Sequence, residues 1–274
     1  MAWLEIGVKR SVGTPNGQVG ASIAQVCLLL VLQLILGIGI GVVLGAIMHT
    51  GAESVLSWTT AFADVVTLIV CLRVGQRWWR LSCEETLPIS RFRITLLIPL
   101  SVTIFGIEAA NSFLVTQLIR FGIVPAFFDT LYDTAVWDSF DIVLSLVVIA
   151  PIVEEITIRG LVLGALLRRY SASTAVAFSA FAFACLHFSP YQFLGPLTIG
   201  LLFGWLRVRC RSLWPGLIGH VMFNAIVILP GLFPVGSLPW FNGPSSQHWW
   251  FTSMGVGALL FGFCGLWFNL RVRE

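Results

Sequence analysis

Charged side chains are scarce in this sequence. Asp, Glu, Lys and Arg together make up 11% of its 274 residues, whereas 57% are hydrophobic. Soluble globular domains carry about 25% charged residues, so this composition excludes a soluble fold. The net charge of +3 is small, and no Gly-rich phosphate-binding loop is present, so nucleic acid is not expected as a partner. Lysine is nearly absent, with one lysine against fifteen arginines, a ratio that hints at a GC-rich, bacterial genome.

Paired cysteines are also missing. The six cysteines are scattered and form no CxxC motif, so neither a disulfide framework nor a thiolate zinc site is indicated. The HExxH signature of zinc proteases is absent as well. A cleavable signal peptide is not expected, because residues 1–22 are fairly polar, carry Lys9 and Arg10, and precede an apolar run too long for a signal sequence.

Apolar runs of about 20 residues recur along the chain, and each is long enough to cross a hydrocarbon core of roughly 30 Å. The sequence therefore predicts an all-α, polytopic membrane protein with about eight transmembrane helices in one bundle. Residues 1–22 form a predicted cytoplasmic N-terminal segment, and residues 23–270 form the transmembrane domain. The predicted spans are Ile23–Met48, Val55–Val74, Ile94–Leu118, Phe140–Leu167, Ala172–Phe188, Phe193–Val208, Leu213–Leu229 and Trp250–Leu270.

Basic residues occur at alternate ends of these spans. They precede the first span, follow the second, fourth and sixth, and close the chain, whereas the loops between hold almost none. By the positive-inside rule this pattern predicts an even number of spans with both termini in the cytoplasm. We expect an integral protein of a bacterial inner membrane.

The predicted fourth span contains two adjacent carboxylates and an arginine, Glu154, Glu155 and Arg159. Ionised groups inside a bilayer are costly unless they are paired or face a wet cavity, so they mark functional sites. Glu155 and Arg159 are four residues apart and share one helix face, where they can pair. Glu154 points about 100° away, so it is predicted to be available for chemistry. A buried Glu–Arg pair can also simply lock helices together in a scaffold or a transporter.

Two histidines lie in later spans, and each is four residues away from another motif residue. Phe183 and His187 form FxxxH, and His220 and Asn224 form HxxxN. Together with Glu154 these polar groups can form one cluster from three helices. Such a cluster can activate water, with the carboxylate as general base and histidine and amide groups as oxyanion donors. A zinc site on Glu154, His187 and His220 is an equal alternative at this point, since two histidines and a glutamate are a known catalytic ligand set.

The ordered set EExxxR, FxxxH and HxxxN resembles the CPBP family of intramembrane proteases, which includes CAAX prenyl endopeptidases and bacteriocin-processing and immunity proteins. The resemblance covers about residues 140–229, the catalytic core of that family, and includes Ser212-Leu213-Trp214-Pro215 before the histidine helix. Ile158 departs from the pattern, because many members have an aromatic residue before the arginine. The first three spans carry no motif that matches.

The resemblance implies a role for each motif residue. Glu154 would activate water with help from His187, His220 and Asn224 would stabilise the oxyanion, and Glu155 with Arg159 would be the supporting pair. It implies hydrolysis of a peptide bond in a membrane-embedded or lipid-anchored protein or peptide. A metal requirement is left open, with zinc as a possible cofactor. The alternative is a non-proteolytic membrane scaffold or bacteriocin self-immunity protein with the same fold.

Three further features are interpreted as packing or surface elements. Gly37, Gly41 and Gly45 form a GxxxGxxxG row, which predicts close approach of another helix. The polar residues Asp64, Glu108 and Asn111 inside spans can line a cavity or bond between helices, and bonding between helices is favoured. The segment Phe121–Trp137 is expected to lie at the membrane interface as an amphipathic piece.

Overall fold

The computed structural model describes residues 21–48, 53–123, 140–190, 192–232 and 249–271. Within these ranges every regular secondary-structure element is helical, and the only β-type pairing is one isolated bridge between Ile89 and Ser212. The elements are α1 (Ile23–Met48), α2 (Glu53–Trp79), α3 (Cys83–Thr86), η1 (Ile94–Leu96), α4 (Leu97–Arg120), α6 (Phe140–Leu144), η2 (Ser145–Ile149), α7 (Ala150–Glu155), η3 (Ile156–Val162), α8 (Leu163–Leu167), α9 (Ala172–Cys185), α10 (Leu194–Cys210), α11 (Trp214–Leu232) and α12 (Trp249–Arg271).

The predicted all-α membrane bundle is confirmed. Four helices are long and apolar enough to cross a membrane, within α1, α2, α4 with its η1 turn, and α12. The α9 helix and the first part of α11 are shorter apolar helices. The run from α6 to α8 is one continuous helical span over the predicted range, residues 140–167. The interface segment predicted after Phe121 lies outside the described residues beyond residue 123.

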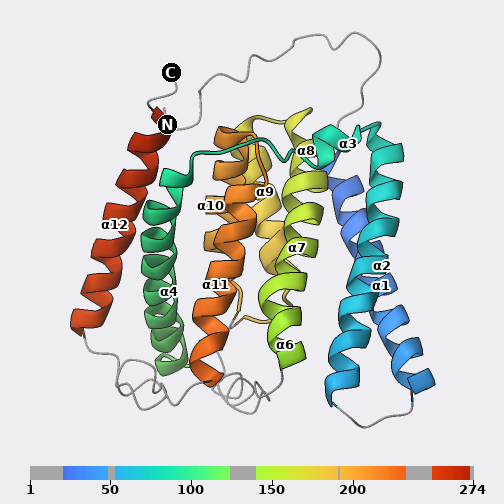
Figure 1. Ribbon diagram of the computed structural model, residues 1–274, viewed down its shortest axis with the longest axis horizontal. Coiled ribbons are helices and arrows are strands. Elements are labelled where there is room, and N and C mark those ends of the chain that lie inside the picture. Colours follow the sequence, from blue (N-terminus) through green and yellow to red (C-terminus); the bar gives the residue numbers. More distant parts are fainter. Residues whose placement is uncertain (1–20, 49–52, 124–139, 191, 233–248, 272–274) are drawn as a thin grey trace.

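The helices lie side by side in one layer-like bundle (Figure 1). The α4 and α12 helices pack together at one side, α1 and α2 pack together at the other, and α9, α10 and α11 lie between them. The span from α6 to α8 contacts both α2 and α11. It therefore lies at the junction between the α1–α2 pair and the rest of the bundle, which is where the two glutamates are placed.

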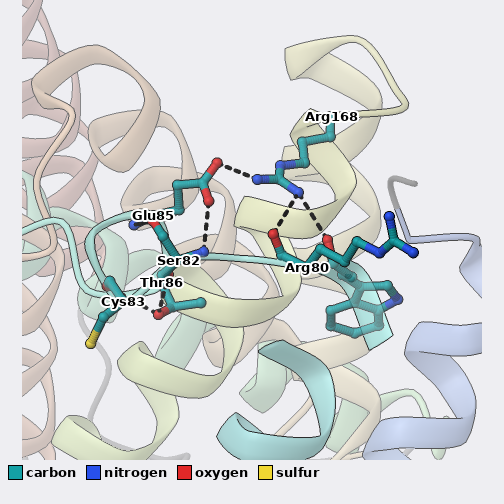
Figure 2. A network of polar contacts seen from close by, with 7 residues as sticks. Arg80, Ser82, Cys83, Glu85, Thr86 and Arg168 are labelled. Atoms are coloured by element: carbon teal, nitrogen blue, oxygen red, sulfur yellow. Dashed lines mark hydrogen bonds and ion pairs between the residues drawn. The ribbon is translucent and has the colours of Figure 1, made fainter. Parts of the chain in front are cut away.

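The loop after α2 folds back against the end of α8 (Figure 2). Arg168 donates to the Trp79 carbonyl at 2.9 Å and forms an ion pair with Glu85 of α3. Ser82 caps α3, because its side chain accepts from the Glu85 N–H while its own N–H donates to the Glu85 carboxylate at 2.7 Å. Burial disfavours the charged form of Glu85, but the Ser82 and Arg168 hydrogen bonds outweigh it, so the pKa of Glu85 lies below its ordinary value.

The same loop packs on the site helix and on the start of α11. A Cβ added at Gly160 would lie 2.3 Å from the Thr86 carbonyl oxygen, so only glycine allows this approach. Ser212 is fully buried and donates to the Ser90 carbonyl at 2.6 Å, and the Leu213 N–H donates to Pro88. The loop thus joins η3 and α11 at the end of the bundle that carries Arg80, Arg168 and Arg211, which is called the arginine-bearing end below.

The prediction for the glycine row is wrong for Gly37 and Gly41. A Cβ at Gly41 would meet nothing within 4 Å, and one at Gly37 would meet only Thr67 Oγ1 at 4.0 Å. Both glycines line a cavity and do not form a close contact with another helix. Of the three polar residues expected to bond between helices, Asn111 does so, because its amide donates to Thr198 Oγ1 at 3.0 Å.

Candidate active site

A buried ion pair and an imidazole form the centre of the site. Glu155 and Arg159 lie one helical turn apart, and Arg159 Nη1 is 2.8 Å from Glu155 Oε1. The contact predicted from their i, i+4 spacing is therefore present. The same carboxylate oxygen is 3.0 Å from His220 Nδ1 of α11. Because a carboxylate can only accept here, His220 donates through Nδ1, and Nε2 is its remaining nitrogen for chemistry.

Two aromatic rings enclose the Arg159 guanidinium. Its central carbon lies 4.5 Å from the centroid of Phe183 and 5.7 Å from that of Phe203. The same two rings contact His220, each with centroids 5.7 Å apart. Apart from the ion pair with Glu155, the guanidinium nitrogens have no polar partner within the described residues, so Glu155 and the ring faces stabilise this charge. The rings also fix the imidazole plane beside Glu155.

Glu154 faces away from this core and into a cavity. Its side chain is 33% exposed, whereas that of Glu155 is 0% exposed, as the helical-face argument predicts. Glu154 Oε2 lies 3.5 Å from His220 Nε2. The cavity has a volume of about 660 Å³ and is lined by α1, α2, α7, η3 and the end of α9. One imidazole therefore links a carboxylate that is sealed in the core to a carboxylate that is open to a cavity.

His187 lines the same cavity from just beyond the end of α9. Its Nδ1 is 3.0 Å from the Phe183 carbonyl oxygen, and its ring packs edge-on against the Phe183 ring. A carbonyl oxygen only accepts, so Nδ1 carries the proton in that contact and Nε2 of the neutral ring is an acceptor. His187 is thus oriented to accept a proton or a hydrogen bond from a group in the cavity.

Asn224 has a contact that its spacing from His220 does not predict. Its amide nitrogen donates to the Leu146 carbonyl at 2.8 Å. Leu146 lies in η2, a π-helical turn in which the Ala150 N–H bonds Ser145, five residues back. In that register the partner of Leu146 would be the N–H of residue 151, which is proline and has none. Asn224 supplies the missing donor and ties α11 to the site helix.

Gly216 lets the buried glutamate approach α11. A Cβ at this position would lie 2.8 Å from Glu155 Oε2. That oxygen is buried and has no hydrogen-bond partner within the described residues, and it lies beside the first turn of α11. The positive end of the helix dipole is favourable for a carboxylate there. Neither this role of Gly216 nor that of Pro151 follows from the sequence motifs, although a proline inside an apolar run is a visible signal of an unpaired carbonyl.

Asp64 lies on α2 and lines the cavity together with Glu154, which is the less favoured of its two predicted placements. The two carboxyl groups are close enough to interact electrostatically. The sequence identifies Asp64 as a polar residue in a span, but nothing in its spacing indicates which helix α2 will face.

The donor set does not fit a metal ion. Within the described residues no three His, Cys, Asp or Glu side chains converge as metal ligands. His220 Nδ1 bonds Glu155 at 3.0 Å and its Nε2 lies 3.5 Å from Glu154 Oε2, so the imidazole is held between two carboxylates. The zinc set of Glu154, His187 and His220 is therefore not supported, and no step of the chemistry below uses a metal.

The helices also resolve an apparent mismatch in depth. Counting along the predicted spans puts Glu154 near mid-membrane and His220 nearer the arginine-bearing end. In the structure His220 contacts both glutamates, so these residues share one level in the bundle. The α9 helix ends at Cys185, which brings His187 into the same cavity as Glu154. Glu154 and His187 thus line one cavity, and His220 contacts Glu154 from the core.

The comparisons with known proteins concern the segment that carries this site. Residues 136–226 match the family model described as Type II CAAX prenyl endopeptidase Rce1-like. A stretch of 88 residues is 30% identical to the protein named "Putative membrane peptidase YdiL" of Bacillus subtilis (strain 168). That stretch covers 32% of this chain and 36% of the relative. No solved structure matches the chain. The resemblance to intramembrane proteases of the CPBP family is thereby confirmed, and the chain is an integral membrane protein.

Proposed function

We propose that this chain is an intramembrane endopeptidase that hydrolyses a peptide bond in a membrane-embedded or lipid-anchored protein or peptide. The single observation that carries the proposal is the link from Glu155 through His220 to Glu154, with Glu154 open to a cavity inside an apolar bundle. Buried charges of this kind are costly in a membrane and are retained where they perform chemistry. The peptidase families matched by this segment support the same class of reaction.

The proposed mechanism begins with a water molecule between Glu154 and His187 Nε2. Glu154 removes a proton from the water as its oxygen attacks the carbonyl carbon of the substrate peptide bond. The carbonyl oxygen becomes an oxyanion, which accepts hydrogen bonds from two groups. One is the Nε2–H of His220 in its doubly protonated form, in which both ring nitrogens donate, and the other is the second amide N–H of Asn224. The proton held by Glu154 then passes to the leaving nitrogen as the C–N bond breaks. The products are a carboxylic acid and an amine, and Glu154 returns to its starting state.

Glu155 and Arg159 are positioning residues in this mechanism. Glu155 accepts from His220 Nδ1, which fixes the orientation of the ring and directs Nε2 toward Glu154. Arg159 neutralises Glu155 in the core, so the imidazole does not have to compensate that charge alone. We also propose that the chain lies in a bacterial inner membrane with both termini in the cytoplasm, and the arginine-bearing loops support this orientation.

The test compares membranes that contain the wild-type chain, Glu154→Gln, or Glu108→Gln. The Glu108 variant is a matched control, because Glu108 is a second glutamate inside the bundle that does not line the cavity. New peptide termini in the membrane fraction are mapped by mass spectrometry, and insertion is checked by carbonate extraction. We expect termini that depend on the wild-type chain and on Glu108→Gln, and that disappear with Glu154→Gln. Termini that persist with Glu154→Gln would support the scaffold or self-immunity alternative instead.

A further inference from the structure

The cavity beside Glu154 extends well beyond the segment that matches the peptidase family. Its far wall is formed by α1 and α2, and residues 136–226 include neither helix. On α1 the wall includes Gln33, Gly37 and Gly41, and on α2 it includes Asp64 and Thr67. The residues on this wall are therefore candidates for substrate selection that is particular to this chain.

The glycine face of α1 leaves room for an extended chain. A side chain at Gly41 would meet nothing within 4 Å, so the space is open and not filled by neighbours. The cavity volume of about 660 Å³ lies within the roughly 300–1,000 Å³ of ligand pockets. Lining residues run along α1 from Leu30 to Val42, a rise of about 18 Å at about 1.5 Å per residue. Five or six residues of extended peptide, at about 3.3 Å each, cover that length.

Two buried polar atoms in this wall have no partner. Gln33 Oε1 and Thr67 Oγ1 are inaccessible and form no hydrogen bond within the described residues, and Thr67 is only 2% exposed. Thr67 Oγ1 points toward Gly37, where an added Cβ would lie 4.0 Å away. Buried oxygens of this kind are normally paired. The wall itself covers these two oxygens, so a ligand N–H reaches them only when the Gln33 and Thr67 side chains rotate toward the cavity. A peptide backbone can supply such donors and a lipid acyl chain cannot, so the two side chains favour a polypeptide as the occupant.

The charge of the cavity lining also limits which occupants the cavity can bind. Glu154 and Asp64 both line it, and no lysine or arginine is among the lining residues. A carboxylate placed between these groups would be repelled in a medium that screens charge weakly. A polypeptide segment that binds here is therefore expected to be neutral or basic, and to be an internal stretch and not a free carboxyl terminus.

We propose that the Gly37–Gly41 face of α1, together with Gln33 and Thr67, is the subsite that binds an extended, internal segment of the substrate polypeptide beside Glu154. This proposal rests on the proposed peptidase function for the reaction that follows binding. It assigns substrate selection to two helices outside the segment that carries the catalytic residues.

The first experiment measures cleavage of a substrate whose new terminus has been mapped in membranes. Gly41→Leu fills the subsite, and Gly39→Leu is the matched control. Gly39 is on the same helix, also has nothing within 4 Å of an added Cβ, and does not line the cavity. We expect Gly41→Leu to lower kcat/KM by about tenfold or more and Gly39→Leu to change it by less than about twofold. Thr67→Val, which keeps the side-chain shape, should raise KM more than it lowers kcat.

The second experiment measures binding without cleavage. A short Leu/Ala/Ser peptide amide with a central benzophenone is photolysed on ice, immediately after mixing, with the chain in phosphatidylcholine vesicles. The same peptide as a free acid and a benzophenone fatty acid are used in parallel. We expect the amide to label α1 and α2 in the wild-type chain and in Gly39→Leu, with labelling strongly reduced in Gly41→Leu. The free acid should label less than the amide, and Asp64→Asn should narrow that difference.

The outcomes separate this proposal from the proposed function. If Glu154→Gln abolishes cleavage while Gly41→Leu and Gly39→Leu behave alike in both experiments, the peptidase function stands and the subsite is overturned. If no cleavage occurs but peptide labelling is lost only with Gly41→Leu, the subsite stands and the peptidase function fails. Labelling of this wall by the fatty acid and not by the peptide amide assigns the cavity to lipid and overturns the proposal. Equal labelling by the amide and the free acid overturns the preference for an internal segment.

Discussion

The two adjacent glutamates have different surroundings, so their variants should differ in stability. Glu155 is fully buried and pairs with Arg159, so removing either partner leaves an unpaired charge. Breaking such a pair costs about 3–5 kcal/mol in soluble proteins. We expect Glu155→Ala and Arg159→Ala to lower the folded yield and the thermal stability in detergent as well as cleavage. Glu154→Ala should abolish cleavage and leave stability equal or higher, because it removes a partly buried carboxylate.

Thermal melts in detergent and cleavage assays on the same three preparations check this prediction. The division of roles is reversed if Glu154→Ala is the least stable variant and Glu155→Ala stays active.

At the residue scale the sequence predicts contacts within a helix well and contacts between helices poorly. Glu155 and Arg159 are one turn apart, so their contact follows from helical geometry alone. The position of Asp64 depends on which face α2 turns toward the site helix, and no local pattern records that. The same reason explains Gly41, because a row of small residues allows a close helix contact but equally allows an open wall.

At the element scale, Pro151 leaves the Leu146 carbonyl without a backbone donor, and Asn224 supplies one. Mutants can test this relationship. Asn224→Ala leaves the Leu146 carbonyl without its donor, and this should cost about 1 kcal/mol of stability. In a Pro151→Ala background the backbone N–H is restored, so the same Asn224→Ala change should cost less. The measurement is a double-mutant cycle of thermal stability. An additive cycle would show that Asn224 does not compensate for the proline.

Cleavage by the same four proteins tests the oxyanion role separately. If Asn224 donates to the oxyanion, activity should stay low in the double variant even where stability is recovered.

The docking of α3 on η3 gives a second prediction at this scale, with a control one turn away. A Cβ at Gly160 would lie 2.3 Å from the Thr86 carbonyl oxygen, whereas one at Gly164 would lie 3.5 Å from that of Glu85. The first contact is impossible without movement of backbone, and the second is an ordinary van der Waals contact. We expect Gly160→Ala to cost about 1–3 kcal/mol and Gly164→Ala to be nearly neutral in thermal melts. Equal melting temperatures for the two variants would contradict the docking described here.

The π-helical turns η2 and η3 are a part of the fold that could not be predicted from the sequence. Hydrogen bonds that skip to the fifth residue leave no mark on composition or apolar periodicity, so residues 140–167 are indistinguishable from an ordinary α-helix by pattern. Pro151 is the one local sign, because it removes a backbone donor. Hydropathy does not predict the loop that carries α3 either, although Ser82 and Glu85 have the spacing of a capping box.

At the scale of the whole molecule, the arginine-bearing loops meet at one end of the bundle. Arg168 reaches the end of α2, and the Ser212 region bonds to Ser90 in the loop after α2. The alternation of basic loops in the sequence therefore corresponds to one face of the folded chain, and the positive-inside rule predicts that this face is cytoplasmic.

Single-cysteine labelling tests this orientation. Cys83 in α3 is exposed at the arginine-bearing end, and Ile123→Cys places a thiol just beyond α4 at the other end. In chains with no other cysteine, a membrane-impermeant maleimide should label Cys83 only in inverted vesicles and the residue 123 thiol only in spheroplasts. The reverse pattern would invert the proposed topology.

The π-helical turn before Glu154 also affects how this chain is compared with its homologues. Deleting one residue between Leu146 and Pro151 would convert the turn to an ordinary α-helical turn, and Glu154 would keep its face, because a π-turn accommodates one extra residue. The Leu146 carbonyl would still face the nitrogen of Pro151, so it would still need the Asn224 amide. In an alignment, a one-residue gap between these two positions should therefore leave both Pro151 and Asn224 in place. Homologues that replace Pro151, in contrast, regain the backbone donor and no longer need a side-chain donor at position 224 for this carbonyl.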